Sequence, residues 1–552
     1  MKKILFIAIG LLVISGMLLT GCSKAASTTT ATTPPTSTAP SPTPTTPVTP
    51  QPVSGGTLRI LASSGPQVLS YVPLMGPGDR AEIFEGAEAL VDTNSARGEM
   101  SGGVEPVLAQ SVDVDAQALT ITFHLRQGVL FHDGTELTSD VAAWNIQQVI
   151  DAKNIPYLDF FKDMKTPDKY TLIIEMSQYN NQMMATWGWW TAMYSKAAWD
   201  TGSGGDLEKG KDWARSHLVG TGPFVLKDFQ PDVSMTWVKN ANYWQKGKPY
   251  LDEIDYKIVP DAVTARAAFE AGQADMWGAP AKDAVELMAK GYVEQAAWPI
   301  LPWGLWPNTA NKDCQMTNIS LRQAVECAID KDAINTAIGH GLYKTLKSVP
   351  WEGEWGYDAN SGNPYNVDKA KQLLATAGFS TSNPCKITLL TTNAFGPDPI
   401  DACTMVKQML DAVGFSVTID QADAGRFFGT AYGKDNIPAA NQDLLFYFAG
   451  GCDTNYLQTY IRWFSTEPFT YVSFMGRTDA QHTMDVEAMG ATDIPTEQAE
   501  TTKAMHYIND NTLIIPIYGF PGYVIQQKWV HSTEYTTGFT RWQTEIVWMD
   551  KH

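Results

Sequence analysis

The amino-acid composition changes sharply near residue 54, and this break limits which part of the chain can fold into a compact domain. Ser23–Pro52 consists almost entirely of Ser, Thr, Ala and Pro and contains no aromatic residue. Such a segment buries too little apolar surface to offset the entropy lost on ordering. Proline favours an extended backbone at ~3.1 Å per residue, so the segment can reach up to ~90 Å. We therefore predict a Thr/Pro-rich tether over residues 22–54, followed by the folded part.

The N-terminus carries the pattern of an export signal. Met1-Lys2-Lys3 is basic, and Ile4–Thr20 is apolar except for a few Gly, Ser and Thr residues. This run is shorter than the ~20 apolar residues of a typical membrane span. It ends in Leu19-Thr20-Gly21-Cys22, which resembles the lipobox of bacterial lipoproteins and implies a signal peptide over residues 1–21 and lipidation of Cys22. Several acyl chains on one residue give stable anchoring; a single transmembrane anchor is the alternative.

Charge and cysteine content narrow the expected partners and cofactors. Lys+Arg 40 against Asp+Glu 59 gives a net charge of −19, which becomes −21 if a signal peptide with its two lysines is removed. Proteins that bind nucleic acid usually carry a basic footprint, so nucleic acid is not an expected partner. The five cysteines after Cys22 include no CxxC pair, and the eight histidines form no HExxH motif. We predict neither a metal site nor a cofactor, and an odd cysteine count leaves at least one thiol without an intrachain partner.

The folded part carries mixed helix and strand signals. Ala118–Leu125 alternates like a half-buried strand, whereas Ser139–Ile150 has the broad apolar face of a helix. Further along, two helical patterns, over residues 366–377 and 400–413, each end at a glycine and lead into an apolar strand pattern. This alternation is typical of an α/β-layered unit. We predict a sheet-rich first lobe and an α/β second lobe, with a boundary near residue 310.

Two helix starts are predicted from capping residues. Ser320-Leu321-Arg322-Gln323 fits a capping box, in which the Ser side chain accepts a bond from the first turn and the Gln side chain reaches back. Asn366 is placed to cap the helix that Gly378 ends.

Motifs of common enzyme classes are incomplete in this sequence. Gly205–Lys211 superficially matches a phosphate-binding loop, but Asp212 stands where a Ser or Thr would reach Mg²⁺, and no apolar strand precedes it. We predict a glycine-rich surface loop there. Gly220-Thr221-Gly222-Pro223 lacks the third glycine and the helix of a dinucleotide-binding turn, and no GxSxG elbow occurs. Close acidic pairs such as Asp113/Asp115 arise by chance among 59 acidic residues. We therefore predict that the protein is not an enzyme.

A series of short motifs runs through the folded part in a characteristic order. The motifs are PVLAQS (106–111), FHLRQGVLFHDGT (123–135), LTSDV (137–141), GTGPF (220–224), NANYW (240–244), PYLDEI (249–254), AAFEAGQAD (267–275), LRQA (321–324), AIDK (328–331), YNVDKAKQLL (365–374), AGF (377–379) and IPIY (515–518). Together they resemble the family 5 extracellular solute-binding proteins, the peptide- and nickel-binding receptors of bacterial ABC importers. The resemblance covers roughly residues 55–540, and its specificity lies in the order of the motifs.

The resemblance implies an α/β fold of the periplasmic-binding-protein type: a bilobal clamp of class II, with two mixed α/β lobes joined by crossover hinge strands. A larger, subdivided first lobe would take residues 55–308 and a second lobe residues 309–513, and residues 514–552 would return to the first lobe. The crossover strands are expected near Leu305–Ala310 and Ile514–Tyr518. Ligand would bind between the lobes, and contacts made only in the closed state would bias a hinge motion.

The same resemblance implies the function of an extracytoplasmic substrate-binding lipoprotein that captures a peptide or peptide-like solute and delivers it to a membrane permease. The expected partners are that solute, the permease subunits of an ABC transporter and the membrane, through the lipid on Cys22. We expect a monomer anchored on the face toward the periplasm or the cell exterior, in either type of envelope. The alternative is a secreted, lipid-anchored hydrolase that acts on carbohydrate or peptide in an aromatic cleft.

One acidic residue is a candidate ligand anchor. Peptide-binding members of the family often place an Asp shortly before an Asn-Phe/Leu stretch, where it pairs with the amino terminus of the peptide. Ungapped counting puts Ala449 at that position, and Asp453 lies four residues later. Either Asp453 takes this role through an offset loop, or the ligand has no free α-amine.

Five aromatic residues are candidate walls of the ligand pocket. Trp303 and Trp306 lie just before the first expected crossover, Trp277 follows the AAFEAGQAD motif, and Tyr447 and Trp463 flank the glycine-containing loop near residue 450. Tryptophan offers a large rigid face and one hydrogen-bond donor, which suits a peptide side chain, an aromatic compound or a sugar. Ordinary core packing is the alternative for each of them.

Overall fold

The computed structural model divides into two units, Met1–Gln51 and Pro52–His552, and the fold described below is that of the second unit. The structure describes residues 51–75, 83–93, 104–153, 158–183, 191–296, 301–350, 352, 354–392, 394, 398–432, 441–448, 472–476, 478–520, 523–532 and 542–551. The predicted signal peptide, Cys22 and most of the tether lie outside these residues, as do Asp453 and Trp463. In the described ranges, no helix has the length and apolar character needed to cross a membrane.

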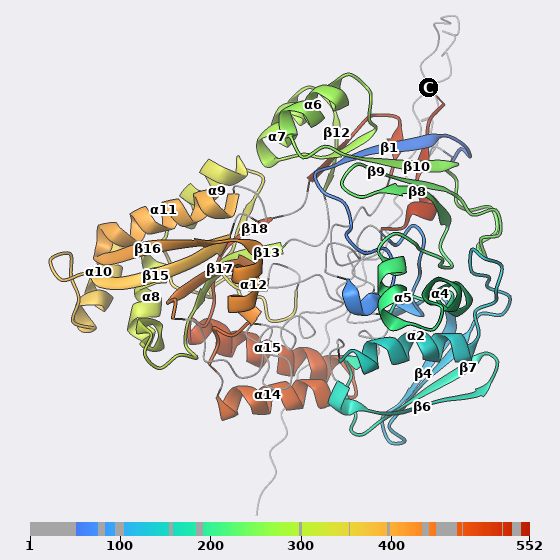
Figure 1. Cartoon of the computed structure of the whole chain (residues 1–552). Helices are drawn as coiled ribbons and strands as arrows, with labels where there is room; N and C mark the ends of the chain where they lie inside the picture. Colours follow the sequence, from blue (N-terminus) through green and yellow to red (C-terminus); the bar gives the residue numbers. More distant parts are fainter. Residues whose placement is uncertain are drawn as a thin grey trace, which may run out of the picture. The chain divides into compact units, whose positions relative to one another are not determined.

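A seven-stranded sheet joins the beginning and the end of the folded unit (Figure 1), in the order β12-β19-β11-β1-β10-β9-β8. Its strands are β1 (Thr57–Ala62), β8 (Phe224–Gln230), β9 (Ser234–Lys239), β10 (Glu253–Ile258), β11 (Met276–Gly278), β12 (Val293–Ala296) and β19 (Tyr523–Gln526). β1 pairs in parallel with β10 and β11, whereas β19 pairs antiparallel with β11 and β12. Helices α6 (Ala262–Glu270) and α7 (Ala281–Ala289) pack beside this sheet.

A six-stranded sheet forms the centre of the later part of the chain, in the order β14-β18-β13-β17-β15-β16. Its strands are β13 (Leu301–Pro307), β14 (Lys344–Thr345), β15 (Cys385–Thr392), β16 (Phe415–Ala422), β17 (Leu444–Phe448) and β18 (Ile515–Phe520). The surrounding helices are α8 (Ile319–Ala328), α9 (Lys331–Gly339), α10 (Val367–Thr376), α11 (Asp398–Val413) and α12 (Ala424–Tyr432). β15 is parallel to β16 and β17, and α11 packs along β15 and β16. This is the α/β layering predicted from the alternating helix and strand patterns.

A four-stranded antiparallel sheet, in the order β4-β5-β7-β6, forms a third layer. Its strands are β4 (Ala109–Asp115), β5 (Thr120–Leu125), β6 (Phe161–Asp168) and β7 (Thr171–Met176), and helix α2 (Ser139–Asp151) packs on β6 and β7. Alternation of Ile121, Phe123 and Leu125 toward the core confirms the predicted half-buried strand. Two helices, α4 (Lys196–Ser203) and α5 (Leu207–Ala214), lie in the connection to the seven-stranded sheet.

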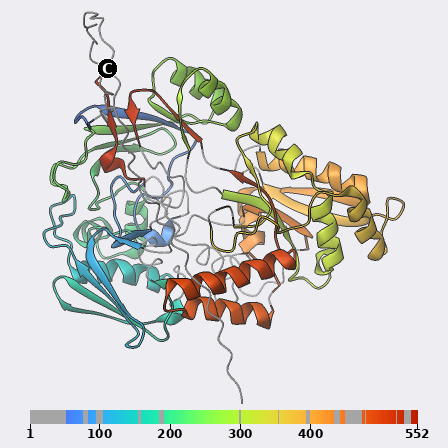
Figure 2. The ribbon, with the colours of Figure 1, turned by 180° about the vertical axis from the view of Figure 1, so that it is seen from behind.

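Two helices near the C-terminus, α14 (Asp479–Gly490) and α15 (Ile494–Asp510), form a hairpin that leads into β18. Figure 2 shows the pair from behind, running side by side. The chain passes from the seven-stranded to the six-stranded sheet between β12 and β13, and it returns between β18 and β19. The first passage leads into β13 and the second leaves from β18, and these two strands pair with each other in the six-stranded sheet.

The predicted helix ends are partly confirmed. The side chain of Asn366 accepts a hydrogen bond from the Lys369 amide and caps α10, and Gly378 beyond its end has φ +89°. The predicted capping box at Ser320 is wrong: Asn318 is the cap of α8, because its side chain accepts a bond from the Ser320 amide. Asn at position 318 starts the helix before Ser320 can act as a cap.

The glycine-rich segment after residue 204 is also more ordered than predicted. Residues 207–214 form α5 rather than a surface loop, and Asp206 caps it by accepting a bond from the Lys209 amide. The prediction gave no weight to Asp206, which supplies the helix start, or to the Trp213–Ala214 end, which supplies an inward face.

Candidate functional site

Neighbouring strands of the six-stranded sheet bring a group of aromatic side chains together. Trp303 on β13 stacks on Phe446 and Tyr518, with ring centroids 5.7 and 6.4 Å apart. Tyr447 and Phe448 contact Trp303 edge-on at 6.3 and 5.9 Å. These contacts arise because β13 lies between β17 and β18, so that Trp303 faces Phe448 on one side and Tyr518 on the other. We call these five residues the β13 aromatic cluster; each such ring pair contributes ~0.5–1.5 kcal/mol beyond its buried area.

The structure brings together two of the aromatic residues predicted to line the ligand pocket, Trp303 and Tyr447. Trp306 lies on the same strand, where it pairs with Leu445. Trp277 belongs to β11 in the other sheet and packs against Phe269, with ring centroids 6.2 Å apart. All four predicted residues are buried, with 0–6% of their surface exposed. In this conformation they pack against protein, and their role toward a ligand stays a prediction.

A tyrosine pair connects the β13 aromatic cluster to a half-buried carboxyl group. Tyr518 stacks on Tyr343 with ring centroids 5.0 Å apart, and the Tyr343 hydroxyl donates a hydrogen bond to Asp398. Burial raises the pKa of Asp398, while the Tyr343 hydrogen bond opposes this shift. Burial also raises the pKa of Tyr518 well above its ordinary value, so its hydroxyl is neutral. Asp398 opens α11 after β15, and ligands of α/β sheets often bind beyond the carboxyl ends of parallel strands.

The sequence patterns did not identify this tyrosine–carboxyl group. Tyr518 stood in the IPIY motif without an assigned role, and nothing in local spacing connects it with Tyr343 or Asp398. The available signal was an acidic residue at the start of a helix that follows an apolar strand.

The substitution Tyr343→Phe is expected to destabilise the protein more at neutral pH than in acid. The pKa of Asp398 is higher in the folded than in the unfolded chain, so the free energy of unfolding is largest below the unfolded pKa and falls as pH rises through the folded pKa. The Tyr343 hydroxyl reduces this fall by binding the carboxylate. Its loss should cost about 1–2 kcal/mol at pH 7 and about half of that or less near pH 3.5. Urea unfolding at both pH values measures this, with the exposed Tyr357→Phe as control; equal losses at both pH values would contradict the role of Asp398.

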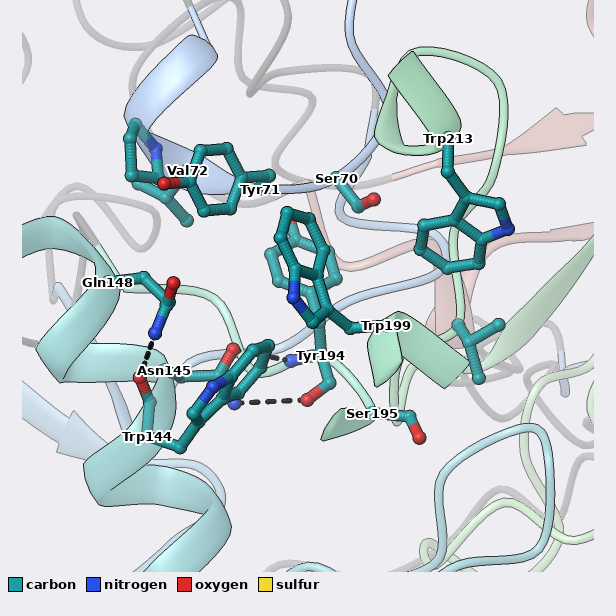
Figure 3. A pocket seen from close by; sticks show the side chains of 12 residues that line it. Ser70, Tyr71, Val72, Trp144, Asn145, Gln148, Tyr194, Ser195, Trp199 and Trp213 are labelled. Carbon is teal, nitrogen blue, oxygen red and sulfur yellow. Dashed lines mark hydrogen bonds between the residues drawn. The ribbon is translucent and has the colours of Figure 1, made fainter. Parts of the chain in front are cut away.

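A second group of aromatic side chains surrounds a small cavity between α2, α4, α5 and the segment after β1 (Figure 3). Tyr71 stacks on Trp199 with ring centroids 4.8 Å apart, and Trp144 lies tilted against Trp199 at 6.1 Å. Asn145 closes one wall by donating to the Tyr194 carbonyl and accepting from the Tyr194 amide. The cavity measures about 20 Å³, which is room for about one water molecule. The rings therefore pack the helices together in this conformation and leave no space for a solute.

The described cysteines are buried thiols. Cys314, Cys327, Cys385 and Cys403 are all free, and burial raises the pKa to about 11 for Cys314 and to about 12 for Cys385 and Cys403. Thiols with such pKa values are neutral at physiological pH and are poor nucleophiles and metal ligands. Within the described part of the chain, no three His, Cys, Asp or Glu side chains are grouped so that they could hold a metal ion. Cys452 lies outside the described residues.

Comparison with known proteins assigns the chain to a family. Residues 103–467, more than half of the chain, match the family described as "Bacterial extracellular solute-binding proteins, family 5 Middle". The chain belongs to this family. The resemblance read from the ordered motifs is thus confirmed, and the family is one of extracellular solute-binding proteins rather than of enzymes.

Curated relatives in the family bind different solutes. The chain is 33% identical over 309 residues to "Heme-binding protein A" of Haemophilus influenzae, a match that covers 50% of this chain and 54% of the relative. It is 26% identical over 344 residues to "Oligopeptide-binding protein AppA" of Bacillus subtilis, which covers 56% of this chain and 60% of the relative. The chain therefore matches only 54–60% of the length of these two relatives.

Solved structures establish the fold over nearly the whole length. The periplasmic binding protein DppA from Helicobacter pylori, in complex with the peptide STSA, has a TM-score of 0.76 and 22% identity, and the match covers 90% of this chain and 99% of that protein. AppA from Bacillus subtilis, in complex with a nonapeptide, has a TM-score of 0.74 and 20% identity, with 91% and 100% covered. The predicted α/β fold of the periplasmic-binding-protein type is confirmed.

Proposed function

We propose that this protein is the lipid-anchored solute receptor of an ABC importer, which captures a peptide or peptide-like solute between two lobes and delivers it to a membrane permease. The match of residues 103–467 to the family is the observation that carries this proposal. The tether and Cys22 would hold a monomeric receptor at the membrane, facing the periplasm or the cell exterior. The acidic net charge of −19 agrees with a solvated extracytoplasmic surface.

The two passages between the large sheets are the proposed hinges. The predicted lobes, residues 55–308 and 309–513 with a return at 514–552, place the boundaries at the ends of β13 and before β18. Because β13 and β18 both belong to the six-stranded sheet, sheet membership supports a first boundary before β13, between β12 and β13, and a second boundary after β18, between β18 and β19. The strands on either side of the two passages are paired, β12 with β19 and β13 with β18, so that one lobe could rotate against the other with changes at few backbone angles.

We assign solute contacts to the aromatic residues on and near the hinge strands. Trp303 and Trp306 lie on β13, which pairs with the return strand β18 on one side and with β17, the strand of Tyr447, on the other. Trp277 on β11, together with Trp463 and Asp453 outside the described residues, completes the proposed set. A rotation about the hinges would change the surroundings of the β13 aromatic cluster first, because β13 and β18 carry the connections. Rigid aromatic faces then offer stacking surfaces at low entropic cost.

A peptide is the favoured solute, and a haem-like compound is the second candidate. AppA and DppA are structural relatives captured with peptides, which supports the first. The 33% identity to a haem-binding protein supports the second, since a flat aromatic macrocycle would stack on tryptophan and tyrosine rings.

Mass spectrometry of the solute that co-purifies with the full chain from native membranes tests this function. We expect peptides or peptide-like compounds, and an N-terminal fragment that starts at an acylated Cys22. Peptides with free N-termini would favour Asp453 as the anchor, whereas solutes without a free α-amine would favour the alternative in which no acidic residue pairs with the ligand's amino terminus. A haem mass with its visible absorption would replace the peptide assignment. Catalytic release of products from peptide or oligosaccharide pools would contradict the receptor function. An uncleaved N-terminus would contradict the lipid anchor.

A further inference from the structure

Two segments about 300 residues apart in sequence contact each other away from the hinge strands. One is the segment Ser177–Met183 that follows β7, and the other is the turn between α14 and α15. We call their meeting point the β7–hairpin contact. In Figures 1 and 2, one end of the α14–α15 hairpin lies beside the region of α2 and β6.

Hydrogen bonds from Asn181 hold the end of α14. The Asn181 amide N–H donates to the Met489 carbonyl at 3.0 Å. Its side-chain Nδ2 donates to the carbonyls of Ala488 and Ala491, at 2.8 and 3.1 Å. The last carbonyls of a helix have no partner within the helix, so these bonds supply an end cap from a distant part of the chain.

The start of α15 is bound through a buried amide–carboxylate pair. Gln182 Nε2 donates to Glu497 Oε1 at 2.8 Å, and Gln182 has only 2% of its surface exposed. Asn180, with 1% exposed, positions Gln182 by accepting a bond from its backbone amide at 2.8 Å. Breaking hydrogen bonds between buried polar groups costs free energy unless water replaces every bond.

The two sides of the contact are fixed to different layers of the fold. Asn181 lies five residues after the end of β7, which is a strand of the four-stranded sheet. The C-terminal end of α15 is held to α8 by Arg322, which donates to the Asn511 and Thr512 carbonyls, and the chain then enters β18. Within the proposed lobes, the contact therefore joins the first lobe to the second at a place separate from β13 and β18.

We propose that the β7–hairpin contact is a latch that forms when the lobes close, and that Asn181 and Gln182 are positioning residues that set solute affinity through the closed population. This rests on the proposed function, since the solute and the clamp motion are those of the receptor. A contact made only in the closed form shifts the equilibrium toward that form, and the apparent affinity falls with the fraction of closed or competent protein. Asn181 and Gln182 need not touch the solute for this effect.

The double variant Asn181→Ala/Gln182→Ala tests the latch without a solute. Alanine removes the side-chain bonds to Ala488, Ala491 and Glu497 but keeps both backbone amides. Because the proposed latch favours the closed form even before solute binds, hydrogen–deuterium exchange on the solute-free full chain should be at least fivefold faster in the segment after β7 and around the α14–α15 turn, and unchanged in β5 and β16. The exposed Asn360→Ala is the matched control and should exchange like the wild type.

Binding of a defined probe, an equimolar pool of tripeptides with free N-termini, measures the effect on affinity. We expect the double variant to bind 5- to 20-fold more weakly than the wild type, with faster dissociation. Wild-type exchange rates, a general increase that includes β5 and β16, or an unchanged affinity would each overturn the latch. If the wild type itself fails to bind the pool, the peptide assignment fails, while the exchange measurement on solute-free protein still decides whether the contact opens as a unit.

Discussion

Replacing Arg322 by methionine is expected to lower the free energy of unfolding by about 3–5 kcal/mol. The guanidinium is buried and donates to carbonyls from two separate segments. Its partners are Met316 and Thr317 before α8, at 2.8 and 3.1 Å, and Asn511 and Thr512 after α15, at 2.7 and 3.2 Å. Burial lowers the pKa of Arg322 to about 10, so the side chain is still protonated at pH 7. Methionine fills similar space without a donor and leaves these carbonyls unsatisfied.

Denaturant unfolding of two control variants separates hydrogen bonding from charge. Arg322→Lys keeps the charge but lacks the planar fork that reaches both segments, so it should restore only part of the loss. Arg215→Met removes an exposed arginine and should change the free energy of unfolding by less than about 0.5 kcal/mol. A loss below about 1 kcal/mol for Arg322→Met would mean that water or shifted backbone satisfies the carbonyls.

Arg322 also shows why the sequence predicts local structure better than tertiary roles. The Ser320-Leu321-Arg322-Gln323 pattern correctly indicated a helix, although Asn318 caps it, because helix formation depends on neighbours within a few residues. The partners Asn511 and Thr512 lie about 190 residues away, and no spacing rule connects them. Asn366 and Gly378 were predictable for the opposite reason, since a cap and a left-handed helix end are local requirements.

The candidate site shows the same division. Trp303 was singled out by its place near an expected crossover and Tyr447 by the glycine-containing loop near residue 450, and they contact each other because β13 pairs with β17. The Tyr343–Asp398 bond was not predictable, because it depends on how α9 packs against α11 and β18. Burial of the tryptophans was equally hidden, since an aromatic residue has the same local signature in a core and in a pocket wall.

Gly220→Ala should abolish stable folding or cost at least about 3 kcal/mol, the scale of severe overpacking. The GTGPF motif passes directly over the backbone of residues 85–87, where the Gly222 amide donates to the Gly86 carbonyl at 3.0 Å. A Cβ on Gly220 would lie 2.1 Å from that same carbonyl oxygen and 2.9 Å from the Ala87 Cα. Backbone atoms cannot rotate away as side chains do, so the clash must separate the two segments.

The separation would also break the hydrogen bonds that surround the motif. Thr221 Oγ1 donates to the buried Glu88 at 3.0 Å, and the His132 amide donates to the Gly220 carbonyl at 2.9 Å. Gly429→Ala is the matched control, because Gly429 lies within α12 with open space around its Cβ position, and alanine there should be neutral or stabilise by up to about 1 kcal/mol. Soluble yield and thermal unfolding compare the two variants. A Gly220→Ala protein as stable as Gly429→Ala would mean that the two backbones can move apart without loss, and that the motif acts only as a turn.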